Sequence, residues 1–194
     1  ILLGIAKKNP SRMIGNIKSK KTQVDFWTLE EFQKVISLLY KGVYYEHYLF
    51  ISFWVLFMTG MRIGEAAALL WSDIDFDTGL LSITKTLYYK SMDDFKPVEP
   101  KTQASVRTIY VDADTIRELK AWQEVQKKVL KNCGYVLSYN GIPTSKHTLP
   151  RALEKLAELA GVHRIKIHAL RHSHASLLVN GKTRVPIQNW SKSA

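Results

Sequence analysis

Eleven consecutive residues, 48–58, are apolar at every position except Ser52, and this run constrains the fold more than any other feature of the chain. A helix over residues 44–59 would be apolar on every side, which is typical of a helix at the centre of a core. The run is well short of the ~20 apolar residues that cross a bilayer. We therefore expect a central core helix and no membrane partner. The chain has 194 residues, enough for one domain with a real core.

The remaining pattern predicts a mainly α fold with a small three-stranded antiparallel sheet, an α+β class. Thr28 and Glu31 have the spacing of a capping box, which predicts a helix that begins at Leu29. A loop is expected over residues 88–102, which contain Pro97 and Pro100. Further helices are expected over about residues 63–70, 112–130, 146–160 and 168–179, and strands over about 73–76, 80–87 and 104–111.

Residues 1–22 are expected to be the tail of an upstream core-binding domain followed by a basic linker. Asn9-Pro10 would end a first helix, and three lysines lie within residues 18–21. Residues 23–194 then form the second unit, which we expect to be incomplete at its C-terminus. A single cysteine, Cys133, allows no internal disulfide framework and supplies no cysteine cluster for zinc. A cytoplasmic protein is the default expectation.

The chain is strongly basic, with 28 Lys and Arg against 17 Asp and Glu, a formal net charge of +11 and a pI of about 9.7. Such an excess favours a polyanionic partner, either DNA, RNA or an anionic membrane surface. Composition alone is equally consistent with a solvated basic surface.

Two short motifs each carry an arginine next to a predicted helix. Arg62 lies in Thr59–Glu65, directly after the apolar helix, and Arg171 lies in His168–His174. Guanidinium is a planar, always-charged fork, and two of them suit the two non-bridging oxygens of a phosphodiester. The simpler alternatives are that Arg62 pairs with Glu65 at a helix junction and that Arg171 is an ordinary surface residue.

Three histidines lie in the second motif. His168 and His172 are spaced i and i+4, which places them on one face of a helix. This spacing can hold zinc, and a metal-dependent hydrolase is the less favoured alternative function, because no nearby Glu, Asp or Cys completes a ligand set. His168 is better suited to proton transfer or to a phosphate contact. We expect His172 to be turned toward the core, and His174 has no clear role.

Three lysines are candidates for a general acid. Lys85 lies in a predicted strand, Lys90 begins the expected loop, and Lys101 lies just before the last strand. A lysine on a hairpin can reach into a DNA groove, although each of the three, taken alone, can equally be a solvated charge.

The order of the motifs resembles the catalytic domain of a tyrosine recombinase, the phage integrase family, and is most similar to integrases of Gram-positive phages and conjugative transposons. The similarity covers about residues 25–180 and implies the fold of DNA breaking-rejoining enzymes. The matching segments, in order, are Thr59–Glu65, Trp71–Asp75, Pro100–Thr102, Arg107–Ile109 and His168–His172.

The resemblance also implies roles for individual residues. Arg62 and Arg171 would clamp the scissile phosphate, and Glu65 would buttress the first arginine. Lys101, preferred to Lys85 on this match, would protonate the departing 5′-hydroxyl, and His168 would assist proton transfer. The family joins DNA through a 3′-phosphotyrosyl intermediate without metal or ATP, so we expect no cofactor. The implied partners are double-stranded DNA attachment sites and, for the full-length enzyme, a homotetramer on DNA.

The chain departs from the family pattern after the second arginine. All nine tyrosines precede His168, the last being Tyr139, so none stands in the place of the nucleophile. Trp190 lies in the wrong local context to act as the family's further active-site residue, and Ala169 stands where relatives often carry Asp. We therefore predict that this polypeptide binds DNA but does not cleave it. The alternative is a non-catalytic DNA-binding remnant or regulator.

Overall fold

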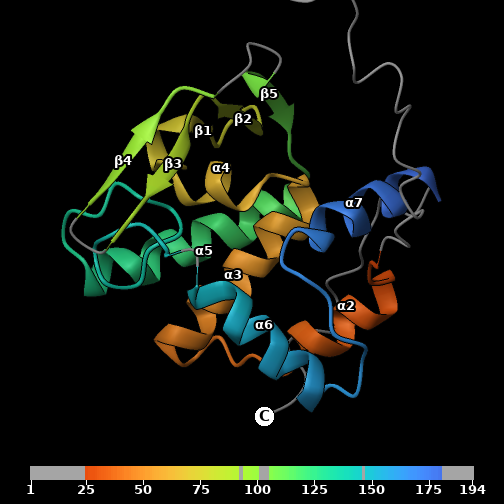
Figure 1. The fold of residues 1–194 in the computed structure, drawn as a ribbon. Helices are drawn as coiled ribbons and strands as arrows, with labels where there is room; N and C mark the ends of the chain where they lie inside the picture. The colour runs from red at the N-terminus through yellow and green to blue at the C-terminus, as the bar shows by residue number, and fades with distance from the viewer. Residues whose placement is uncertain (1–24, 92–93, 101–104, 146, 181–194) are drawn as a thin grey trace, which may run out of the picture.

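The computed structural model describes residues 25–91, 94–100, 105–145 and 147–180 (Figure 1). The expected upstream tail and linker at residues 1–22, and the segment 181–194 that carries Trp190, lie outside the described residues.

The fold is mostly helical with small antiparallel sheets, as predicted. A short 3-10 helix, η1, spans Trp71–Asp73. The α-helices of the described residues are α2 (Leu29–Ile36), α3 (Tyr44–Thr59), α4 (Ile63–Ala67), α5 (Ala113–Val129), α6 (Thr148–Leu159) and α7 (Ala169–Val179).

Helix α3 is the central element of the core, and the prediction for residues 44–59 is confirmed. Its side chains are buried on every side, and it packs against α2, α5, α6 and α7 (Figure 1). The helix ends at Gly60, which adopts a left-handed conformation with φ of 61° that favours glycine. No helix among the described ranges is long and apolar enough to cross a membrane.

Helix α2 begins with the expected capping box. The Thr28 hydroxyl accepts from the Glu31 amide, and the Glu31 carboxylate accepts from the Thr28 amide. Immediately before it, Trp27 is buried and its amide donates to Ser173 Oγ on α7 at 2.9 Å. The start of the described chain is therefore tied to the helix that carries the second motif.

The three-stranded sheet has the order β1 (Ile74–Asp75), β2 (Leu80–Ile83), β5 (Arg107–Tyr110), with both pairs antiparallel. The register places Ile83 opposite Arg107. Consequently the end of β2 and the beginning of β5 lie side by side above α4 (Figure 1).

One predicted part of the sheet is wrong. The expected strand over residues 80–87 divides into β2 and β3 (Thr86–Tyr89), and the expected loop contains β4 (Phe95–Val98). β3 and β4 form a separate two-stranded hairpin in which Leu87 lies opposite Pro97. Proline is tolerated because each strand of an isolated hairpin has a free edge. Its presence made the segment look like a loop.

Candidate phosphate-binding site

A buried carboxylate, Glu65, lies at the centre of the site. It is only 3% exposed. It contacts two arginines from different elements: Arg62 Nη1 lies 2.9 Å from Glu65 Oε1, and Arg107 Nη2 lies 2.8 Å from Oε2. The Arg62 amide also donates to Glu65 Oε2 at 3.0 Å, which closes the first turn of α4. One carboxylate thus fixes an arginine before α4 and an arginine at the start of β5.

The electrostatics of Glu65 follow from these contacts. Burial alone would raise the pKa of this carboxyl, but hydrogen bonds from Arg107 and Arg62 outweigh burial and lower the pKa. Glu65 is therefore a charged group that neutralises only part of the positive charge around it. The cluster keeps a net positive charge that can face an anion.

Arg171 approaches the same cluster from α7. Its Nη1 donates to the carbonyl of Gly60, two residues before Arg62. Burial, followed by the positive charges of Arg62 and Arg107, lowers the pKa of Arg171, which nevertheless stays charged because guanidinium is so strong a base. The structure therefore brings Arg171 close to the segment that carries Arg62, although the two arginines are 109 positions apart in the sequence.

His168 lies at the N-cap of α7, one turn before Arg171. Partial burial of the ring, and then the positive charges of His172, Arg171 and Arg62, lower its pKa. The rings of His168 and His172 share a helix face with their centroids 5.3 Å apart. Within the described segments, no group of three or more His, Cys, Asp or Glu could hold a metal ion.

The expected orientation of His172 is wrong. The side chain is exposed, and the positions of α7 that face the core are Leu170, Ser173 and Leu177. These positions are spaced i, i+3 and i+7, which leaves His172 on the opposite face. A histidine that does point inward is His174, whose pKa is lowered chiefly by burial.

His174 explains why Gly60 has no side chain. A Cβ built on Gly60 would lie 2.5 Å from His174 Cδ2, closer than atoms can approach. Gly60 thus lies between His174 and Arg171, both on α7. This packing sets the distance between α7 and the segment that leads to Arg62.

The three candidate lysines lie in different places. Lys85 occupies the turn between β2 and β3, with its Nζ 3.0 Å from both carboxylate oxygens of Asp73. The next residue, Thr86, contacts α4, because its Oγ1 lies 2.6 Å from where a Gly64 Cβ would be. Lys90 is at the far end of the hairpin, 3.6 Å from Asp94. Lys101 lies outside the described residues.

Arg107 is the site residue that sequence reasoning missed. It lies in the Arg-Thr-Ile motif, but no local spacing connects it to Glu65, 42 residues earlier. The contact exists because β5 pairs with β2 above α4. The only sequence signal was the motif itself.

The model of the phage integrase family matches residues 28–188, which is most of the chain. The chain belongs to this family.

Known proteins support the assignment. The chain is 29% identical over 184 residues to the ICEBs1 integrase of Bacillus subtilis (strain 168), covering 91% of this chain and 49% of that protein. It is also 29% identical over 191 residues to a XerC-like tyrosine recombinase of Caldanaerobacter subterraneus subsp. tengcongensis, covering 89% and 47%. The chain thus spans about half the length of these curated relatives.

Solved structures have the same fold. The Tn1549 transposon integrase in complex with transposon right end DNA superimposes with a TM-score of 0.72 at 20% identity, covering 97% of this chain and 69% of the other. A lambda integrase dimer bound to a core site gives a TM-score of 0.60 at 17% identity, covering 87% and 57%.

Proposed function

We propose that this chain is the catalytic part of a site-specific DNA recombinase that integrates mobile-element DNA through a 3′-phosphotyrosyl intermediate. The observation that carries the proposal is the convergence of Arg62, Arg171 and His168 beside the Arg107–Glu65 pair. The proposed partner is a double-stranded DNA attachment site, bound in the cytoplasm, on which the full-length enzyme forms a homotetramer. All nine tyrosines of the chain precede His168, and none of them stands in the position of the family's nucleophile.

In this proposal Arg62 and Arg171 bind the two non-bridging oxygens of the scissile phosphate. Phosphoryl transfer develops negative charge on these oxygens, and guanidinium groups already held in position stabilise it without reorganisation. Glu65 holds Arg62, and Gly60 holds Arg171, so both arginines are oriented before DNA binds. His168, whose pKa is lowered by its surroundings, can accept or relay a proton near neutral pH.

A lysine supplies the proton for the departing 5′-oxygen. The family resemblance assigns this role to Lys101. Among the described lysines, Lys85 is the better placed, because the adjacent Thr86 packs against Gly64, two residues after Arg62. Asp73 holds the Lys85 ammonium, so a role in catalysis requires Lys85 to leave this partner.

A substrate with sulfur in place of the bridging 5′-oxygen distinguishes the two lysines. A thiol has a pKa near 8.5 and needs no protonation to depart, unlike an alcohol. In a gene product extended to include an in-frame tyrosine, alanine at the true proton donor should abolish cleavage of normal DNA and leave cleavage of the sulfur substrate intact. Lys85→Ala and Lys101→Ala are compared in this way, and Lys127→Ala, at an exposed lysine on α5, serves as the control.

The function itself is tested with a nicked attachment-site duplex on a denaturing gel. The chain as given should bind the duplex and give no covalent protein–DNA band, whereas the extended product should give one that Arg62→Ala and Arg171→Ala remove. A strong covalent band from the chain as given would refute the missing nucleophile. If the extended product binds DNA but never forms the band, the protein is a non-catalytic DNA-binding remnant or regulator.

A further inference from the structure

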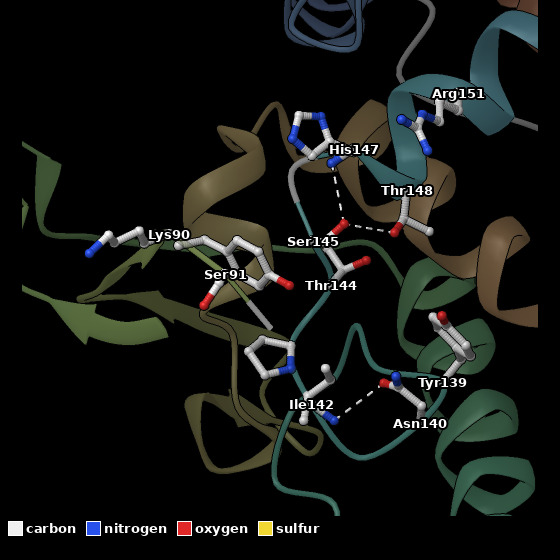
Figure 2. A pocket seen from close by; sticks show the side chains of 12 residues that line it. Lys90, Ser91, Tyr139, Asn140, Ile142, Thr144, Ser145, His147, Thr148 and Arg151 are labelled. Carbon is white, nitrogen blue, oxygen red and sulfur yellow. Dashed lines mark hydrogen bonds between the residues drawn. The ribbon is translucent and has the colours of Figure 1, made fainter. Parts of the chain in front are cut away.

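A second hollow lies away from the arginine cluster, between the turn of the β3–β4 hairpin and the segment that leads into α6. It has a volume of about 340 Å³ and is not used in the recombinase mechanism above. Its described lining contains no Asp or Glu. Figure 2 shows Lys90 and Ser91 on the hairpin side of the hollow, and Ser145, His147, Thr148 and Arg151 on the α6 side.

The cation best placed for a ligand is Arg151, in the first turn of α6. Its side chain is exposed, and it forms no ion pair within the described segments. Arg164, near the other end of α6, has by contrast two carboxylate partners, Glu154 and Glu158. Lys90 adds positive charge at the rim, although its ammonium lies 3.6 Å from Asp94 and points away from the hollow in Figure 2.

Neutral hydrogen-bonding groups line the wall beneath Arg151. Ser145 Oγ and Thr148 Oγ1 lie 2.9 Å apart, and the His147 amide donates to Ser145 Oγ at 3.3 Å (Figure 2). The N-cap His147 makes no side-chain hydrogen bond to α6, so the positive end of this helix is open to a ligand. The buried Tyr89 hydroxyl, also in the lining, has no partner among the described residues.

The hollow is connected by strand β3 to α4, the helix that follows Arg62. β3 begins at Thr86, in contact with Gly64, and ends at Tyr89, in the lining of the hollow. Three residues of a strand span about 10 Å at ~3.3 Å per residue. The start of α6 connects the two places as well, because Pro150 shares a hollow with His168 while Arg151 lines this one.

From these observations we propose that the hollow binds a backbone phosphate of the DNA, distinct from the scissile phosphate, with Arg151 as its principal ligand. The proposal rests on the DNA-binding function proposed above. An arginine without a carboxylate partner, two hydroxyls and an open helix N-terminus are the donors that a phosphate requires. Each strand of a duplex carries a phosphate every ~3.4 Å of helix axis, so DNA bound at the arginine cluster also presents phosphates about 10 Å away.

The test compares Arg151→Ala with Arg117→Ala in binding a fluorescent duplex between 50 and 200 mM salt. Arg117 is the matched control, an exposed arginine on α5 that pairs with Asp114. Loss of one phosphate contact should lower the slope of log K against log salt by about 0.9. It should also weaken binding roughly tenfold, as expected for a charge-assisted contact. Arg117→Ala should bind as the parent chain does.

Duplexes that carry one neutral methylphosphonate at successive positions then locate the phosphate. One position should weaken binding by the parent chain and leave Arg151→Ala unaffected. Thr148→Val, which removes a hydroxyl at nearly constant volume, should weaken binding two- to threefold, and equal thermal midpoints confirm that the variants are folded. If the parent chain does not bind duplex DNA, the proposed function fails. If it binds and Arg151→Ala matches Arg117→Ala, only the second phosphate site is overturned.

Discussion

Two ionisable side chains of this protein are equally buried, but one is held in its charged form and the other in its neutral form. Glu65 and His47 are each 3% exposed. Glu65 is held by Arg62 and Arg107, and their hydrogen bonds lower its pKa despite burial. Neither ring nitrogen of His47 has a hydrogen-bond partner in the described part of the chain, and burial, with Lys41 as a lesser cause, lowers its pKa to about 4.

The difference lies in the partners of the two buried groups. His47 is kept neutral and packs edge-on against Trp122, with ring centroids 5.2 Å apart, so it behaves as one more buried aromatic side chain of α3. Glu65 keeps its charge in the interior because two cations accompany it. A buried charge is retained only where such partners offset its desolvation, and one of the two partners here, Arg62, belongs to the proposed phosphate clamp.

The largest effect on stability is expected from removal of the Glu65 carboxylate, which Arg62 and Arg107 hold. Glu65→Ala would leave Arg62 and Arg107 close together without a carboxylate, and should lower the free energy of unfolding by about 3 kcal/mol. Urea unfolding at pH 7 measures the loss, and Glu65→Gln, which keeps the shape, should lose less. The control is Glu154→Ala, which breaks an exposed pair with Arg164 and should cost less than about 1 kcal/mol. Equal losses for Glu65→Ala and Glu154→Ala would show that Glu65 does not organise the cluster.

His47 should produce a smaller effect that depends on pH. In the unfolded chain histidine takes up a proton near pH 6.5, but in the folded protein only near pH 4. The unfolded state therefore binds more protons between these values, and stability falls by about 2 kcal/mol from pH 7 to pH 5. His47→Phe, which keeps an aromatic ring against Trp122, should remove this part of the fall.

Urea unfolding at pH 7 and pH 5 gives the comparison for His47→Phe and the parent chain. His147→Ala, at an exposed histidine, is the matched control and should leave the fall in place. An equally steep loss of stability in His47→Phe would mean that other groups cause the acid sensitivity.

Local sequence rules predicted one half of the Glu65 cluster and not the other. The Arg62–Glu65 pair was anticipated because the two residues are three positions apart at a helix start. Arg107 was not, since its approach depends on the pairing of Ile83 with Arg107 across the sheet, and register cannot be read from either strand alone. The apolar run of α3 was equally easy to assign, because a helix without a polar face must be buried in the core.

The remaining misses have related causes. The β3–β4 hairpin was not predicted because Pro97 indicates a loop in most contexts. Proline is nevertheless tolerated in a strand with a free edge. His172 was predicted to turn toward the core, whereas Leu170, Ser173 and Leu177 of the same helix fill the buried face. In both cases the outcome depended on packing: on the pairing of β3 with β4, and on the face of α7 that meets the core.

The smallest effect is expected at His172. A substitution there tests whether neighbouring charges, as well as burial, lower the pKa of His168. His172→Ala removes a positive neighbour, so the pKa of His168 should rise toward its ordinary value and remain lowered by partial burial, Arg171 and Arg62. Stability should change by no more than about 0.5 kcal/mol, because the side chain is exposed. An NMR titration of the His168 ring follows the shift, with His163→Ala, on a loop before α7, as the control. An unchanged pKa in His172→Ala would make His168 resemble His47, a histidine controlled by burial rather than by its charged neighbours.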